Sequence, residues 1–151
     1  MLPIEFSNLY DEKHNDLINE LESVIIYSEV LNVLQDLKQN FRIFLISNLA
    51  SPYKKSVFDN NLDHYFEKMI FSCDYGCLKP ENDIFKEVEK ITKNEPSEIL
   101  MIGDSFKSDI IGARKMKWNY LKINRNTPIT KGYEIKDLSE IRKHIITTKL
   151  F

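Results

Sequence analysis

Residues 99–113 hold an apolar run that leads directly into a Gly-Asp pair, and this stretch constrains the fold more than any other. The apolar residues 99–102 predict a buried strand, and Gly103 lets the backbone turn sharply where the strand ends. Asp104 then lies at the carboxyl end of the strand, where open α/β sheets bind their ligands. Asp109 falls in the first turn of the next predicted helix, where the helix dipole favours a carboxylate.

Asp104 and Asp109 together suggest a metal site. Two hard oxygen ligands in one cleft suit Mg²⁺, which takes one or two protein carboxylates together with water and phosphate oxygens. The alternative is that both side chains only cap the helix. Residues 99–113 alone leave the two interpretations equally open.

A second apolar run, residues 42–48, ends in Ser47 and Asn48. It predicts a buried parallel strand with polar groups at its tip. The Ser47 hydroxyl could donate a hydrogen bond to a phosphoryl oxygen, although a serine is also common in a simple strand-end turn.

Lys79 follows a third apolar run, residues 69–72, and precedes Pro80 at the start of a predicted helix over 81–92. An ammonium group held there can neutralise phosphate charge. A solvated surface lysine is the commoner case, so this prediction depends on Lys79 occurring together with Ser47 and the two aspartates.

Short apolar runs alternate with amphipathic segments along the whole chain. The pattern predicts helices over residues 11–23, 29–39, 52–60, 81–92, 107–117 and 138–146, and strands over residues 42–46, 68–72, 99–103 and 119–123. Strands and helices that alternate at this spacing form right-handed βαβ crossovers. We therefore expect an α/β fold, a Rossmann-like three-layer sandwich with a parallel sheet.

The order of hydroxyl, lysine and paired aspartates resembles the motifs of the haloacid dehalogenase (HAD) superfamily of phosphohydrolases, and the resemblance extends from residue 27 to the C-terminus. Residues 45–48 resemble the second motif, whose Ser or Thr binds the phosphoryl group. Residues 72–80 resemble the third motif, which carries a charge-stabilising lysine. Residues 102–109 resemble the fourth motif, which carries the metal-binding aspartates.

The resemblance implies a HAD-like, Mg²⁺-dependent phosphatase that acts on a small phosphorylated metabolite. Ser47, Asn48 and Lys79 would then bind phosphate, with Ser47 and Lys79 as the catalytic groups that hold the phosphoryl group during transfer. Asp104 would bind Mg²⁺ with the support of Asp109. The substrate is not predicted, because the cap domain shapes specificity in this family.

The family's first motif, an Asp-x-Asp at the end of the first strand, occurs nowhere in the 151 residues. In the family its first aspartate attacks phosphorus, and its second acts as general acid and base. Since loss of a covalent nucleophile removes most of the rate, we expect the chain to be inactive or nearly so. Two other interpretations stay open, namely a non-catalytic phosphate-binding or regulatory relative and a C-terminal fragment of a split or longer enzyme.

Residues 11–23 form an acidic amphipathic segment with apolar residues on one side. In family members with a helical cap, a helix at this place would be the last piece of the cap. We therefore expect residues 1–26 to be a cap remnant or a replacement N-terminal segment, and residues 27–151 to be the HAD-like core. A rival alignment places residues 24–30 on the first motif.

The family's first strand lies in the middle of the sheet, between the strands that here end at Ser47 and Asp104. Its absence would leave buried backbone groups unpaired, at a cost of about 1 to 3 kcal/mol each. We expect residues 3–6, residues 24–27, or a strand from a second copy or another chain to fill the gap. Direct pairing of the flanking strands is the remaining possibility. The chain alone is predicted to be poorly soluble, oligomeric or less stable than its size suggests.

The composition fits one compact domain. Hydrophobic residues make up 42% of the chain, so a proper core is expected. The 21 basic and 23 acidic residues are interspersed and give a net charge of −2, which argues against a nucleic-acid partner. No apolar run approaches the roughly 20 residues that span a bilayer, and the N-terminus lacks a signal-like pattern. We therefore expect a cytoplasmic protein with no membrane partner.

Overall fold

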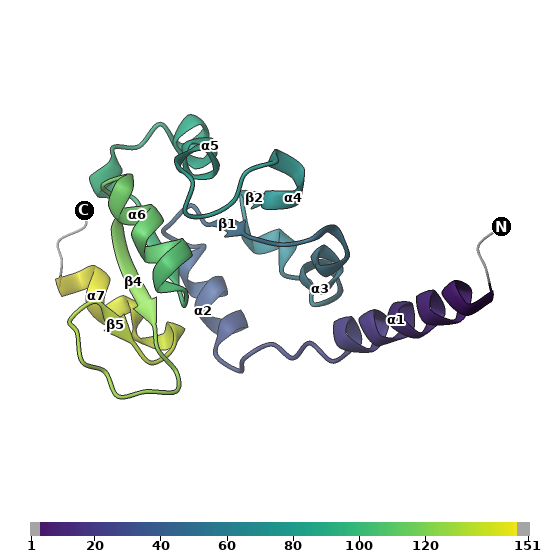
Figure 1. Cartoon of the computed structure of the whole chain (residues 1–151). Coiled ribbons are helices and arrows are strands. Elements are labelled where there is room, and N and C mark those ends of the chain that lie inside the picture. The colour runs from purple at the N-terminus through teal and green to yellow at the C-terminus, as the bar shows by residue number, and fades with distance from the viewer. Residues whose placement is uncertain (1–3, 148–151) are drawn as a thin grey trace.

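The computed structural model describes residues 4–147, and the side chains of residues 13–145. Its α-helices are α1 (Ile4–Glu22), α2 (Val30–Leu37), α3 (Lys54–Asp59), α4 (Ser72–Tyr75), α5 (Asn82–Thr92), α6 (Ile111–Lys115) and α7 (Ile141–Thr147) (Figure 1). Its strands are β1 (Phe44–Ser47), β2 (Lys68–Phe71), β3 (Leu100–Gly103), β4 (Asn119–Ile123) and β5 (Glu134–Ile135).

The strands pair in parallel, which confirms the predicted α/β fold, but they form two sheets. One sheet has the order β1-β2, and the register places Ser47 opposite Phe71. The other has the order β3-β4-β5, with Gly103 opposite Lys122. The sequence did not predict β5, because two residues are too few to show an alternating pattern.

Two apolar clusters on opposite faces of the strands give the fold its three layers. The first, here called the α5 cluster, consists of Ile70, Ile84, Phe85, Val88, Met101, Ala113 and Trp118. The second, here called the α7 cluster, consists of Leu121, Ile135 and Ile141, against which half-buried Val33, Leu37, Leu100, Ile102, Ile123, Leu138 and Ile145 pack. Helices α5 and α6 therefore cover one face, and α2 and α7 cover the other.

The α5 cluster joins the two sheets through side chains. Ile70 of β2 and Met101 of β3 both pack under α5, around the fully buried ring of Phe85. Helix α6 approaches the same ring so closely that a Cβ on Gly112 would lie 2.1 Å from its Cζ atom. Burial of apolar area, rather than backbone hydrogen bonds, therefore holds the two sheets together in this layer.

No strand lies between β1 and β3 among residues 4–147, so the predicted fillings of this gap from the described part of the chain are wrong. Residues 4–6 begin helix α1, and residues 24–27 form no strand. Pro3 lies outside the described residues. Tyr27 stacks on Arg125, whose guanidinium carbon lies 3.7 Å from the ring centroid, and this contact holds the end of the 24–27 segment beside the loop after β4.

The flanking strands β1 and β3 also do not pair directly with each other, so that alternative is wrong as well. The α5 cluster spans both sheets, and the Lys79 side chain lies between the carboxyl ends of β1 and β3. Lys79 therefore links the end of β1 to the turn after β3 in place of direct strand pairing.

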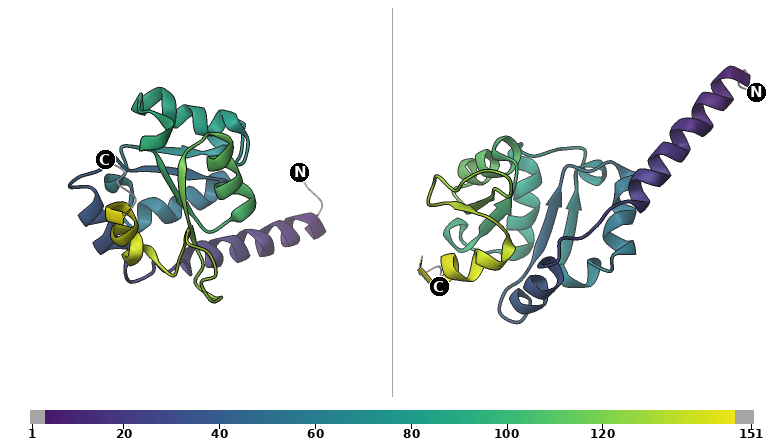
Figure 2. Two further views of the ribbon diagram at one scale, coloured as in Figure 1. Left: turned by 90° about the vertical axis from the view of Figure 1, so that its left-hand side faces the viewer. Right: turned by 90° about the horizontal axis from the view of Figure 1, so that it is seen from below.

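Helix α1 extends away from the rest of the fold (Figure 2). It begins at Ile4, earlier than the predicted start at residue 11, and ends close to the predicted end. Its C-terminal part contacts the start of α3, where Tyr53 Oη donates to Glu20 Oε2 over 2.9 Å. Whether residues 1–26 are a cap remnant stays a prediction. Within residues 4–147, no helix has the length and apolar character needed to cross a membrane.

Candidate functional site

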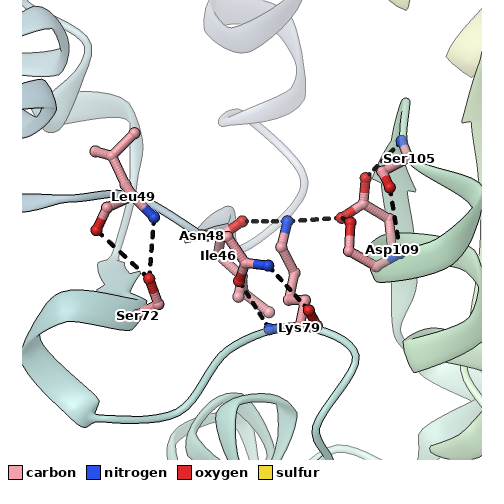
Figure 3. Close-up of polar contacts among 8 residues, drawn as sticks. Ile46, Asn48, Leu49, Ser72, Lys79, Ser105 and Asp109 are labelled. Carbon is pink, nitrogen blue, oxygen red and sulfur yellow. Dashed lines mark hydrogen bonds and ion pairs between the residues drawn. The ribbon is translucent and has the colours of Figure 1, made fainter.

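The carboxyl ends of β1 and β3 bring Lys79 and Asp109 together in a buried ion pair (Figure 3). Lys79 Nζ lies 2.6 Å from Asp109 Oδ1, and the two side chains are only 11% and 4% exposed. Lys79 Nζ also donates to the main-chain oxygen of Ile46 over 2.9 Å. The ammonium group therefore bridges the end of β1 and the turn that follows β3.

The turn after β3 places the Asp109 carboxylate. Asp109 Oδ2 accepts a hydrogen bond from Ser105 N over 2.9 Å, and the Ser108 hydroxyl lies 3.4 Å from Oδ1. A Cβ on Gly103 would lie 2.2 Å from Oδ2, so only glycine fits at the end of this strand. The predicted continuous helix over 107–117 is instead a wide helical turn, Phe106–Ile110, followed by α6. This turn directs Asp109 inward, toward Lys79.

Asn48 holds the main chain of Lys79. Asn48 Nδ2 donates to Lys79 O over 2.9 Å, and Lys79 N donates to Asn48 Oδ1 over 2.7 Å (Figure 3). Both ends of the amide are thus engaged with the loop before α5. Asn48 positions the lysine in this structure, and its predicted contact with phosphate stays a prediction.

Ser72 is a positioning residue that the sequence analysis did not single out. Leu49 N donates to Ser72 Oγ over 3.0 Å, which ties the loop after β1 to the end of β2. A signal was present in the sequence, because Ser72 ends one predicted strand and Ser47 directly follows another. Ser47 itself is half-buried at the tip of β1.

Asp104 and Asp109 do not form a pair of equivalent metal ligands. Asp104 is exposed at the end of β3, whereas Asp109 is buried and both of its oxygens accept hydrogen bonds. Among the described residues, no group of three or more His, Cys, Asp and Glu side chains could hold a metal ion. Asp104 still fits Mg²⁺, which commonly uses one protein carboxylate and keeps several waters. The roles of Asp104 and Asp109 in binding Mg²⁺ stay predictions.

Lys79, Asp109 and the end of β1 meet at one edge of the fold, and Ser47 and Asp104 lie at the carboxyl ends of β1 and β3. A buried ammonium, a hydroxyl at a strand tip and an exposed carboxylate for a divalent cation are what a phosphoryl group requires for charge neutralisation. The low exposure of Lys79 and Asp109 strengthens electrostatic interactions at this edge relative to those in water.

Comparison with known proteins gives the same family as the motifs. The haloacid dehalogenase-like hydrolase family matches residues 1–117. Glyceraldehyde 3-phosphate phosphatase of Pyrococcus abyssi is 32% identical over 103 residues, which cover 68% of this chain and 43% of that protein. Phosphoglycolate phosphatase of Aquifex aeolicus is 26% identical over 121 residues, covering 72% of this chain and 56% of that protein.

A solved HAD phosphatase from Thermococcus onnurineus has the same fold, with a TM-score of 0.77 and 27% identity over 85% of this chain and 62% of that one. The chain spans about half the length of the curated relatives it matches. The family match covers well over half of the chain, and the buried Lys79–Asp109 pair lies where the third and fourth motifs meet. The chain belongs to the haloacid dehalogenase-like hydrolases.

Proposed function

We propose that this chain provides the phosphate-holding and metal-holding part of a Mg²⁺-dependent phosphatase for small phosphorylated metabolites. The observation that carries the proposal is the buried ammonium of Lys79, fixed by Asp109 and by Ile46 O at the end of β1, the strand whose last residue is Ser47. The names of two relatives, a glyceraldehyde 3-phosphate phosphatase and a phosphoglycolate phosphatase, support this substrate class.

Each residue of the site has a separate role in this proposal. Lys79 and Ser47 hold the phosphoryl group, while Asn48 and Asp109 position Lys79 through its main chain and its ammonium group. Asp104 would hold Mg²⁺, which when bound supplies charge neutralisation of the phosphoryl oxygens.

We further propose that the 151 residues alone do not turn over a phosphate ester. They contain no Asp-x-Asp, and the buried carboxylate of Asp109 is engaged by Lys79 and Ser105 rather than directed at a substrate. A covalent phosphatase of this kind needs an attacking carboxylate. The second candidate, a non-catalytic phosphate-binding domain, is favoured by this same feature.

Location in the cytoplasm stays part of the proposal.

Calorimetric titration with MgCl₂, in the presence of inorganic phosphate, tests the metal assignment. We expect weak binding by the wild type and none by Asp104→Asn, because Asp104 is the exposed carboxylate at this edge. Asp59→Asn is the matched control, since Asp59 is an exposed aspartate on α3. Equal, tight binding by the wild type and Asp104→Asn would show that Asp104 is not the ligand.

Hydrolysis of an aryl phosphate with Mg²⁺ tests the expected inactivity. We expect no turnover above that of buffer. Turnover that disappears in both Asp104→Asn and Lys79→Met would refute the inactivity proposal, and it would require an attacking carboxylate elsewhere in the chain. Phosphate binding without turnover, even when a carboxylate-bearing strand is added, would favour the non-catalytic candidate.

A further inference from the structure

Strand β2 has an open backbone edge on the side away from β1. It is the last strand of its sheet, and no strand among residues 4–147 pairs with this side. On the β1 side, Glu67 N donates to Ile43 O over 2.8 Å. Since backbone groups alternate in direction along a strand, the N–H and C=O groups of Lys68 and Ile70 face outward. An edge with unpaired backbone groups is a template for pairing with another chain.

This edge is the longer of the two outer strand edges in the described part of the chain. The other outer edge belongs to β5, which has two residues, whereas β2 has four. Strand β2 therefore offers more outward backbone groups to a partner than β5 does.

A groove of about 440 Å³ lies beside this edge, between α3 and β2. The rings of Phe58 and Phe66 and the side chain of Met69 line it. Phe58 is 47% exposed, and Phe66 and Met69 are half-buried. A strand paired to the open edge would cover this apolar surface, which favours association.

Two opposite charges line the same groove at the two ends of β2. Lys54 Nζ lies 5.4 Å from the ring centroid of Phe71, the last residue of the strand. Glu67 directly precedes the strand, and its side chain lies on the same face as that of Phe71, four residues later. Lys54 is 25% exposed and Glu67 is 41% exposed. A cation at one end and an anion at the other make this edge complementary to an antiparallel copy of itself.

We propose that two copies of this chain associate through the outer edges of β2, antiparallel to each other about a two-fold axis at Met69. Lys68 of each copy then lies opposite Ile70 of the other, and each such pair exchanges both of its N–H···O hydrogen bonds. The two copies use the same surface, as a two-fold interface requires.

This register brings the opposite charges together across the interface. Glu67 lies opposite Phe71 of the second copy in a pair without backbone hydrogen bonds, where Cβ atoms are about 4.5 to 5.5 Å apart. Because the Lys54 ammonium stands at the ring of Phe71, Glu67 of each copy meets Lys54 of the other. Arg42 and Asp74 already bind these two groups, but an ammonium has three donors and a carboxylate accepts more than two hydrogen bonds.

Lys68 projects from the opposite face of β2, the face that packs under α5 through Ile70. Lysines on edge strands discourage pairing. In the proposed register the two Lys68 side chains are diagonal neighbours, with Cα atoms about 7 to 8 Å apart, and both are exposed. Removal of this side chain should therefore strengthen the association, whereas removal of its N–H should weaken it.

The interface lies apart from the Lys79 site and takes no part in the proposed phosphatase function, so the two proposals can fail separately. Sedimentation velocity of the full 151-residue chain, from micromolar to millimolar concentration, measures the dimer without phosphate or Mg²⁺. We expect a reversible dimer. A chain that stays monomeric over this range would overturn the proposal.

Two substitutions of Lys68 separate the backbone from the side chain. Lys68→Pro removes the outward N–H from the first residue of the strand, a place where proline is tolerated, and should weaken the dimer by about tenfold or more. Lys68→Ala keeps the N–H and should dimerise at least as tightly as the wild type. Circular dichroism verifies that both variants fold. Equal Kd values for wild type and Lys68→Pro, or equal loss in both variants, would contradict the proposed pairing.

A mixing experiment tests the charges between copies. Lys54→Glu and Glu67→Lys should each weaken their own dimer by about tenfold or more, because like charges then meet twice across the interface. An equimolar mixture of the two variants should dimerise again, since both cross-interface pairs regain opposite charges. A mixture that associates no better than its separate components would overturn the register.

Hydrogen exchange, measured by NMR at low and high protein concentration, locates the interface. The Ile70 amide faces outward and should become protected only at high concentration, although its side chain is fully buried in each copy. The Met69 and Phe71 amides face β1 and should be protected at both concentrations. An Ile70 amide whose exchange does not change with concentration would show that the two copies meet elsewhere, and would overturn the proposal.

Discussion

Asp109→Asn tests whether the buried ion pair with Lys79 organises the site. The substitution keeps the shape of the side chain but removes the charge, and it can place an amide donor against the Lys79 ammonium. Removing one partner of a buried ion pair lowers the free energy of unfolding by about 3 to 5 kcal/mol, because the other charge stays buried without a partner. Since Lys79 is 11% exposed and keeps Ile46 O as an acceptor, we expect a loss near the lower end, about 3 kcal/mol.

This loss is large against the roughly 5 to 15 kcal/mol that stabilises a typical domain. For a chain of this length it corresponds to a fall in Tm of roughly 6 to 12 °C. Urea unfolding at neutral pH, followed by circular dichroism, measures the free energy of unfolding directly. Asp59→Asn is the matched control, because Asp59 pairs with Lys55 on the surface and both side chains are more than half exposed. We expect that control to lose at most about 0.5 kcal/mol.

A double-mutant cycle separates the ion pair from other effects of Asp109→Asn. In a Lys79→Met background the buried ammonium is gone, so Asp109→Asn should cost far less than in the wild type. A loss below about 1 kcal/mol in the wild-type background, or an equal loss in both backgrounds, would refute the reasoning.

Two further substitutions test the packing and the electrostatics of the fold. Gly112→Ala should lower the free energy of unfolding by about 1 to 3 kcal/mol, because its Cβ would overlap the buried ring of Phe85. Gly132→Ala is the control, since no atom lies near its Cβ position, and it should change the free energy of unfolding by under about 0.5 kcal/mol. Equal effects of the two substitutions in urea unfolding would contradict the packing argument. The Thr130 N–H donates to Glu134 and lowers the pKa of that carboxyl below its ordinary value near 4.5. The resulting stabilisation is present at pH values above that ordinary pKa and is lost as pH falls through the lower pKa of the folded state. The difference in free energy of unfolding between wild type and Glu134→Gln should therefore shrink on acidification. A difference that does not depend on pH would refute this role of the Thr130–Glu134 hydrogen bond.

The order of the elements could be predicted from the sequence because it depends on short-range patterns. Apolar runs of four or five residues and amphipathic helical segments are local features, and β2, β3, β4 and α5 lie within a residue or two of their predicted bounds. Ser47, Lys79 and Asp104 could be selected as candidates in the same way, because each follows or ends an apolar run, and their roles in binding stay predictions. The parallel pairing also followed, since alternating strands and helices allow few other topologies.

Tertiary contacts decided which of these residues meet. The sequence predicted a shared metal site, with Asp104 as ligand and Asp109 as its support. The wide turn Phe106–Ile110 instead buries Asp109 beside Lys79 and leaves Asp104 exposed. No local pattern predicts this, because the partner that makes burial of a carboxylate tolerable lies in a different loop.

The division of the strands into two sheets was also decided by tertiary structure. The sequence contains no Asp-x-Asp, but it did not show whether residues 24–27 or direct pairing of β1 with β3 would occupy the place of a central strand. That outcome depends on long-range contacts. Arg125 stacks on Tyr27 and pairs with Glu29, and the α5 cluster packs across both sheets. A short apolar run can be a strand or a loop with equal local preference, and the packing of the whole fold selects between them.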